Sequence, residues 1–121
     1  MQEKRKSLRL PLAATAKIVN TNGTQLYACA RNISRGGIGL YSCSPLDEDT
    51  EVRLEIMFKD IRGNNKVETV HGRIEWQYKW HYIYVIGAIF NQLLDHEETP
   101  GLLEYIESSE RLLYEEGRTM G

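Results

Sequence analysis

The chain has 121 residues, which is close to the modal size of a single domain. Hydrophobic residues make up 41% and charged residues 26%, values that exclude a disordered chain, a collagen-like chain and a disulfide scaffold. The formal net charge of −2 provides no overall excess of positive charge for binding a polyanion.

The charge is unevenly distributed along the chain. Residues 1–94 carry 13 basic and 9 acidic groups, a net of +4, whereas residues 95–121 carry 2 basic and 8 acidic groups, a net of −6. Four of the basic groups lie within the first nine residues, where Glu3 is the only acidic residue. We therefore expect any phosphate-binding site to lie away from the acidic C-terminal segment.

The first half of the chain reads as three strands. Residues 12–19 predict a strand, and Asn22-Gly23 predicts a tight hairpin turn, because glycine adopts positive φ at no steric cost. Residues 24–31 then form the return strand. Residues 32–37 are rich in turn-forming residues, and residues 38–42 predict a third strand.

The second half continues with strands and ends in a helix. Residues 52–59 alternate apolar and polar side chains, the pattern of a strand buried on one face. A second hairpin turn is predicted at residues 62–65, followed by strands at residues 67–77 and 81–90. Residues 99–116 predict an amphipathic helix, with Thr99 as its cap and Gly117 at its end.

These elements predict one mainly β domain over residues 1–121, a six-stranded antiparallel β-barrel with a C-terminal α-helix. Within it we expect a flexible N-terminal segment (1–11), the barrel (12–91) and the helix (99–116). Leu102, Ile106 and Leu113 share the apolar face of that helix.

The sequence argues against membranes, metals and secretion. No apolar run approaches the roughly 20 residues that cross a bilayer, so we expect no membrane insertion. The basic start is followed by an apolar stretch that is too short for a signal peptide and contains Pro11, so we expect a cytoplasmic protein. Cys29 and Cys43 are expected to be small core residues, and the three histidines lack ligand spacing, so no metal or cofactor is expected.

Two short motifs carry groups suited to a nucleotide ligand. Arg5 and Arg9 lie four residues apart, and arginine pairs bidentately with phosphate oxygens or with guanine O6 and N7. Asn32, Ser34 and Gly37 follow the second predicted strand. Asparagine can read a base edge, serine adds a hydroxyl, and glycine leaves room for a close approach of the backbone.

In this order and on this strand pattern, the motifs resemble the PilZ domain, the bacterial receptor module for cyclic di-GMP (c-di-GMP). That family carries Arg-x-x-x-Arg before its first strand and (Asp/Asn)-x-Ser-x-x-Gly after its second. Arg5 and Arg9 match the first motif, and Asn32, Ser34 and Gly37 match the second.

The resemblance covers nearly the whole chain. Residues 10–12, 36–40, 72–76 and 86–90 are similar to the corresponding segments of the family. One departure is Lys4, which stands where many members carry a further arginine and lacks its bidentate fork.

The resemblance implies a PilZ-like split barrel that binds c-di-GMP and relays it, by a conformational change, to an unidentified downstream protein. It implies that Arg5 and Arg9 clamp phosphates or guanines, that Asn32 reads a guanine edge, that Ser34 contacts base or phosphate, and that the backbone at Gly37 packs on the ligand. Lys4 and Arg35 are secondary candidates for ligand contact.

Two other functions remain open at this stage. One is a PilZ-like adaptor that acts by protein contact without ligand. The other is a single-stranded nucleic-acid-binding barrel that stacks bases on four aromatic residues, Tyr78, Trp80, Tyr82 and Tyr84. We favour core and rim positions for these rings, so nucleic acid is the weaker alternative. No nucleophile, acid–base pair or phosphate-cradling loop indicates an enzyme.

Overall fold

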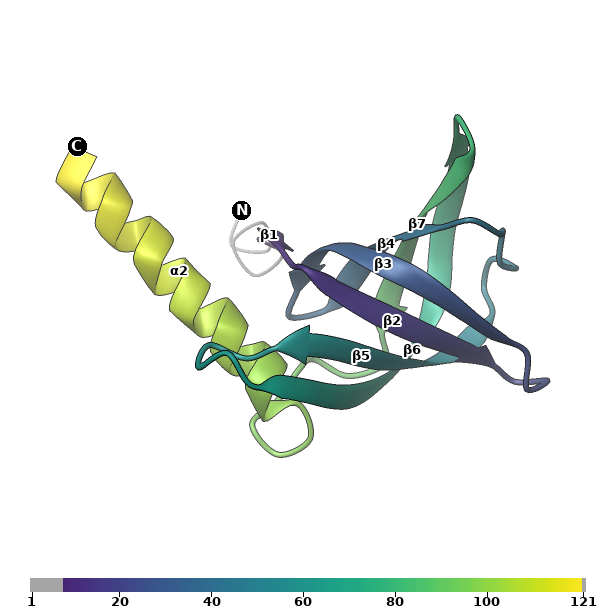
Figure 1. The fold of residues 1–121 in the computed structure, drawn as a ribbon, viewed down its shortest axis with the longest axis horizontal. Helices are drawn as coiled ribbons and strands as arrows, with labels where there is room; N and C mark the ends of the chain where they lie inside the picture. Colours follow the sequence, from purple (N-terminus) through teal and green to yellow (C-terminus); the bar gives the residue numbers. More distant parts are fainter. Residues whose placement is uncertain (1–7, 121) are drawn as a thin grey trace.

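A computed structural model describes residues 8–120 and contains a closed barrel with one helix (Figure 1). The elements are β1 (Leu10–Pro11), β2 (Ala14–Asn20), β3 (Gln25–Ser34), β4 (Gly37–Ser42), β5 (Glu51–Lys59), β6 (Asn65–Trp80), β7 (Ile83–Phe90) and α2 (Pro100–Met120). The strand order is β3-β2-β5-β6-β7-β4, and β4 pairs back with β3 to close the barrel. The short strand β1 pairs with residues 32 and 33 near the C-terminal end of β3. All pairings are antiparallel. The predicted six-stranded barrel and C-terminal helix are confirmed.

Three hairpin turns differ in how they reverse the chain. The β2–β3 and β5–β6 turns place Gly23 and Gly63 at φ values of 89° and 86°, as their sequences predict. At the β5–β6 turn, Asp60 Oδ1 also accepts hydrogen bonds from the backbone N–H groups of Arg62 and Asn64, both at 2.9 Å. The β6–β7 turn instead has His81 at a φ of 57°, without a glycine.

Several predicted boundaries were wrong. Residues 32–34 continue β3 instead of forming a turn, because all three pair with β4 and residues 32 and 33 also pair with β1. Residues 78–80 extend β6, which pairs with β7 up to Trp80↔Ile83. The helix also continues past Gly117, which is therefore not its end.

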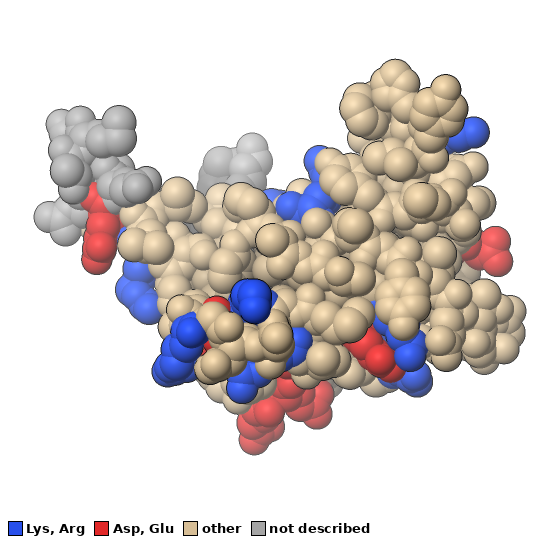
Figure 2. Space-filling view, in the orientation of Figure 1, with Lys and Arg blue, Asp and Glu red and all other residues tan. Residues whose placement is uncertain are grey.

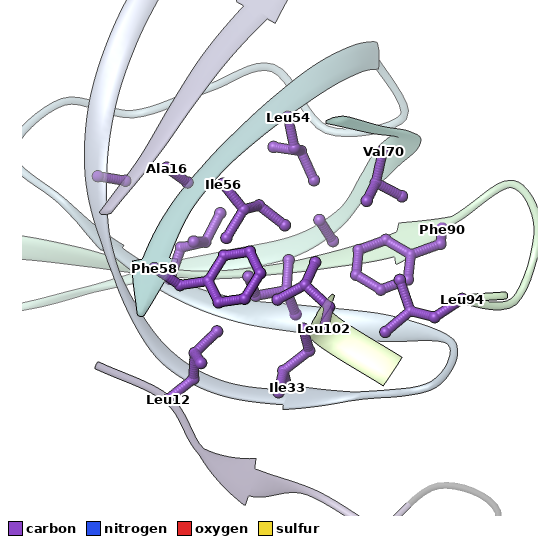
Figure 3. Packing of buried hydrophobic residues seen from close by; sticks show 14 of the residues in the cluster. Leu12, Ala16, Ile33, Leu54, Ile56, Phe58, Val70, Phe90, Leu94 and Leu102 are labelled. Carbon is purple, nitrogen blue, oxygen red and sulfur yellow. The ribbon is translucent and has the colours of Figure 1, made fainter. Parts of the chain in front are cut away.

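The core fills the barrel and extends under the first turns of α2. Figure 3 shows side chains from several strands meeting Leu102 of α2 beside Phe90 and Leu94. The hydrophobic residues with essentially no exposed surface are Leu10, Ala16, Ile18, Ile33, Ile38, Leu40, Leu54, Ile56, Ile74, Ile86, Leu102 and Ile106. Burial of this apolar surface is the main force that holds helix and barrel together.

The helix is attached to the barrel at its N-terminal end and projects beyond it (Figure 1). The backbone N–H groups of Gly101 and Leu102 donate to the two carboxylate oxygens of Glu68 on β6, at 2.7 and 2.9 Å. A carboxylate there satisfies two free helix donors and interacts favourably with the helix dipole. Leu113, expected on the packed face, is 51% exposed because its turn lies past the barrel.

Both cysteines are free and exposed, so the expectation of core positions was wrong. Cys29 lies on β3 beside the buried Ala28, and alternation along the strand turns its side chain outward. Among the described side chains, no group of histidine, cysteine or carboxylate residues could hold a metal ion. The described part of the chain also lacks a helix long and apolar enough to cross a membrane.

Candidate ligand-binding site

The structure brings the two sequence motifs together. Arg9 immediately precedes β1, whose Pro11 pairs with Asn32 on β3. As a result, Arg9 Nη1 donates a hydrogen bond of 3.0 Å to Asn32 Oδ1. The other arginine of the motif, Arg5, and the secondary candidate Lys4 lie outside the described residues.

Two glycines set the position of these side chains. A Cβ at Gly39 would lie 2.7 Å from Asn32 Oδ1, so the bare glycine allows the amide to fold across β4. A Cβ at Gly37 would lie 2.7 Å from the carbonyl oxygen of Ala88 and 3.5 Å from Arg9 Nη2. Gly37 therefore permits both the close pairing of β4 with β7 and the approach of the Arg9 guanidinium.

Ser34 is buried and supports the turn between β3 and β4. Its hydroxyl donates to the carbonyl of Gly37 at 3.5 Å and accepts from the backbone N–H of Gly36 at 3.4 Å. Both contacts are long, so the hydroxyl keeps capacity for a stronger partner. Ser34 also lies in the wall of a cavity beside this turn.

A cavity of about 290 Å³ opens between the β3–β4 turn and β7. Its lining residues come from the segment before β1, the β3–β4 turn, β6, β7 and the loop after β7. They are Arg9, Ser34, Arg35, Gly36, Gly37, Glu75, Ala88, Ile89 and Leu93. Three of the five predicted site residues thus share one cavity, and Asn32 joins them through its bond to Arg9.

The electrostatics of the cavity favour an anion. Burial and, to a smaller extent, the neighbouring Arg31 guanidinium lower the pKa of Arg9, while the Glu75 carboxylate raises it. Arginine nevertheless stays protonated in proteins. Within residues 8–115, no carboxylate forms an ion pair with Arg9, whose hydrogen-bond partner is a neutral amide. A partly desolvated cation without an ion-pair partner is stabilised by an incoming phosphate.

Arg35, the other described arginine of the cavity, is held by the helix. Its Nη1 and Nη2 atoms donate to the two carboxylate oxygens of Glu110 at 2.7 and 3.1 Å. The pair is bidentate and about a quarter to a third exposed on each side. It joins the β3–β4 turn to α2, two segments separated by 75 residues.

Sequence reasoning missed the contributions of Glu75, Gly39 and Glu110. Glu75 carried a signal only as part of the segment at residues 72–76, and Glu110 only as one of many helix carboxylates. Gly39 lies in a glycine-rich strand, but its contact with Asn32 depends on a bulge between Ala30 and Asn32 that shifts the register of β3 on β4.

Comparisons with known proteins agree with this geometry. Residues 3–107 match the family model described as "PilZ domain". Among solved structures, the PilZ domain with c-di-GMP of YcgR from Escherichia coli is 15% identical, with a TM-score of 0.65 and coverage of 95% of this chain and 98% of that one. The inhibitor of motility MotI/DgrA from Bacillus subtilis is 12% identical, with a TM-score of 0.66 and coverage of 88% and 52%.

The K. pneumonia MrkH–c-di-GMP complex is 18% identical, with a TM-score of 0.61 and coverage of 95% of this chain and 55% of that one. The chain therefore spans about half the length of the MotI and MrkH chains. No curated protein matches it in sequence. The family match covers most of the chain. PilZ domains are receptors and adaptors and not enzymes, which agrees with the prediction from the sequence. The chain belongs to the PilZ domain family.

Proposed function

We propose that this PilZ domain is a receptor for c-di-GMP. The observation that supports it best is the pair formed by Arg9 and Asn32, a guanidinium and an amide joined at the edge of a cavity. The ligand carries two phosphates and two guanines. A guanidinium and an amide are the side chains suited to phosphate oxygens and to guanine edges.

Each motif residue has a role in this proposal. Arg9 binds a phosphate or a guanine Hoogsteen edge, and Arg5 binds the ligand from the segment that precedes it. Asn32 exchanges its bond to Arg9 for a guanine edge. Ser34 contacts the ligand from the cavity wall, and the backbone at Gly37 forms the floor.

The relay to a downstream protein uses Arg35. A phosphate offers the same paired oxygens as the Glu110 carboxylate, so ligand and helix compete for one guanidinium. When the ligand takes Arg35, α2 loses its contact with the β3–β4 turn. The change alters the surface that a partner protein meets, and the protein acts as a switch in the cytoplasm without catalysis.

Titration calorimetry with c-di-GMP tests the receptor function, with GTP and linear di-GMP as controls. We expect specific binding of c-di-GMP by the wild type and no measurable binding by Arg9→Ala. The matched control is Arg62→Ala, which removes an arginine 67% exposed on the distant β5–β6 turn and leaves the affinity unchanged. Wild-type affinity in Arg9→Ala would sink the proposal.

A ligand-independent adaptor is the second candidate, and the Arg35–Glu110 pair is the observation that favours it. The pair joins the turn to the helix through side chains of the chain itself. An adaptor shows no heat of binding with c-di-GMP at any concentration, and its Arg9→Ala variant still binds the partner protein.

A further inference from the structure

The hairpin formed by β6 and β7 extends beyond the barrel. On the outer edge of β6, pairing with β5 stops at Arg73, and on the outer edge of β7, pairing with β4 stops at Tyr84. Residues 78–83 therefore pair only within the β6–β7 hairpin, from Tyr78↔Val85 to Trp80↔Ile83, and they lie in a two-stranded ribbon that projects from the molecule (Figure 1). We call residues 78–83 the ribbon tip.

The ribbon tip carries exposed aromatic rings. Tyr78 is 55% exposed, Trp80 is 57% exposed and Tyr82, at the apex, is 92% exposed. These values correct the expectation of core and rim positions for the aromatic residues; of that set, only Tyr84 packs against the core. Exposing rings of this size to water costs free energy. Three of them on one small projection therefore indicate a surface that a binding partner covers.

The turn at the apex is not built for stability. The β2–β3 and β5–β6 hairpins place glycine at positive φ, whereas this one places His81 there, at 57°. A side chain in that region costs free energy that glycine would avoid. The sequence Trp80-His81-Tyr82 therefore keeps bulky rings at the apex at the expense of the turn.

The charge around the rings is one-sided. Residues 76–94 contain one lysine, Lys79, and no aspartate or glutamate. In Figure 2 the visible side of the projection is tan apart from one blue side chain, with no red on it. At the base of the projection, Glu48 accepts a hydrogen bond from the backbone N–H of Gln77.

We propose that the ribbon tip binds the surface of a bilayer that contains anionic phospholipid. Tryptophan and tyrosine have an apolar body and a polar edge, which suits the layer between acyl chains and headgroups. Lys79 supplies the charge that favours an anionic headgroup. A narrow convex ribbon buries little area against a flat protein surface, whereas a bilayer surrounds it on all sides.

Single-stranded nucleic acid fits the ribbon tip less well. Proteins that bind it combine stacking rings with a groove of several basic residues that follows the backbone. Lys79 is the only lysine or arginine in the ribbon tip. Stacking alone would leave the phosphates of a strand without partners.

The proposed contact is shallow and separate from the ligand cavity. The rings enter the headgroup layer and no segment crosses the bilayer, so the proposal departs from the sequence-based expectation of no membrane insertion only at this tip. None of residues 78–83 lines the cavity beside Arg9. Membrane binding can therefore succeed or fail independently of c-di-GMP binding.

Vesicle flotation tests the proposal with the full chain. Vesicles of equimolar phosphatidylglycerol and phosphatidylcholine are expected to bind the wild type at about 1 mM lipid, and pure phosphatidylcholine less. The double variant Trp80→Ser/Tyr82→Ser is expected to bind at least about tenfold more weakly. The matched control is Tyr27→Ser, which removes a ring 60% exposed on β3 and leaves vesicle binding unchanged.

A spectroscopic measurement locates the contact. The chain has two tryptophans, so in Trp76→Phe the fluorescence comes from Trp80 alone. We expect anionic vesicles to shift this emission to shorter wavelength and brominated lipid to quench it. Circular dichroism of each variant checks the fold.

Four outcomes overturn the proposal. These are no binding of the wild type to anionic vesicles, equal binding to pure phosphatidylcholine, unchanged binding by the double variant, and no response of Trp80 to lipid. Binding of single-stranded oligonucleotides that the double variant loses, with no vesicle binding, assigns the ribbon tip to nucleic acid instead.

Discussion

The β3–β4 turn and the β6–β7 turn lie on neighbouring strands and are built in opposite ways. At the first, Gly37 packs on the backbone of Ala88 and Arg35 is held by Glu110 of the helix. At the second, Tyr82 is 92% exposed and His81 has a strained backbone. Fixed side chains suit the recognition of a small ligand, whereas exposed rings suit a surface without a defined shape.

We expect substitutions at the β3–β4 turn to lower the free energy of unfolding more than substitutions at the β6–β7 turn. In Gly37→Ala the new Cβ overlaps the Ala88 carbonyl, so β4 must move away from β7. We expect a loss of roughly 1–3 kcal/mol in the free energy of unfolding, measured by thermal or urea unfolding, together with weaker c-di-GMP binding. The control is Gly36→Ala, whose Cβ meets only Leu93 at an ordinary 3.5 Å. Equal losses in the two variants would contradict the tight packing at Gly37.

At the second turn the expected change has the opposite sign. His81→Gly relieves the positive φ and should raise the free energy of unfolding by about 0.5–1 kcal/mol, seen as a higher midpoint of thermal unfolding. Gly63→Ala, at a φ of 86° with open space around its Cβ, is the reciprocal variant and should lower that midpoint. A less stable His81→Gly would mean that the imidazole contributes more than its backbone costs.

The helix contact at the first turn gives a smaller effect on affinity. In Glu110→Gln the amide competes less well than a carboxylate for Arg35. Since a partly exposed ion pair contributes about 1 kcal/mol or less, we expect c-di-GMP to bind up to about fivefold more tightly in calorimetry. Weaker binding would show that Glu110 positions Arg35 for the ligand instead of competing with it. Glu107→Gln, one turn earlier on the same helix, controls for the lost charge.

The β5–β6 turn, held by Asp60, is the reference for a turn stabilised by hydrogen bonds, and the pH dependence of its stabilisation is confined to acid pH. The backbone N–H of Asn64 is the main cause that lowers the pKa of Asp60 below its ordinary 3.8, with Arg62 assisting. A lowered pKa in the folded state means that the stabilisation is present above pH 3.8 and is lost as pH falls through the folded value. The stability difference between wild type and Asp60→Ala should therefore shrink below about pH 4. A difference that stays constant down to pH 2 would exclude this role of the carboxylate.

Short-range signals in the sequence were enough for most of the fold. Residues 52–59 alternate and form β5, and Gly23 and Gly63 take the positive φ that their turns require. The extension of β3 to Ser34 was not predictable from local composition, because it depends on the pairing of residues 32–34 with β4 and of residues 32 and 33 with β1, more than 20 residues earlier.

The same limit applies to the site. The motif predicted that Arg9 and Asn32 act together, and their side chains are hydrogen-bonded. The partner of Arg35 lies 75 residues away and the partner of the helix N-terminus 33 residues away, at Glu68. Nothing in local composition selects one carboxylate among the many that the chain carries, so these contacts required the structure.

The anchoring of α2 by Glu68 has a mechanical consequence. Because the N-terminus of the helix is bonded to Glu68 on β6 and its C-terminal turns project past the barrel, we expect the helix to turn as a lever about Gly101 when the Arg35–Glu110 contact is exchanged. Its 21 residues correspond to a length of about 30 Å. A rotation of only about 10° at the pivot moves the far end by about 5 Å. In the proposed switch, the exchange of the Glu110 oxygens for phosphate oxygens at Arg35 is thus amplified into a displacement of the far end of the helix as large as a side chain.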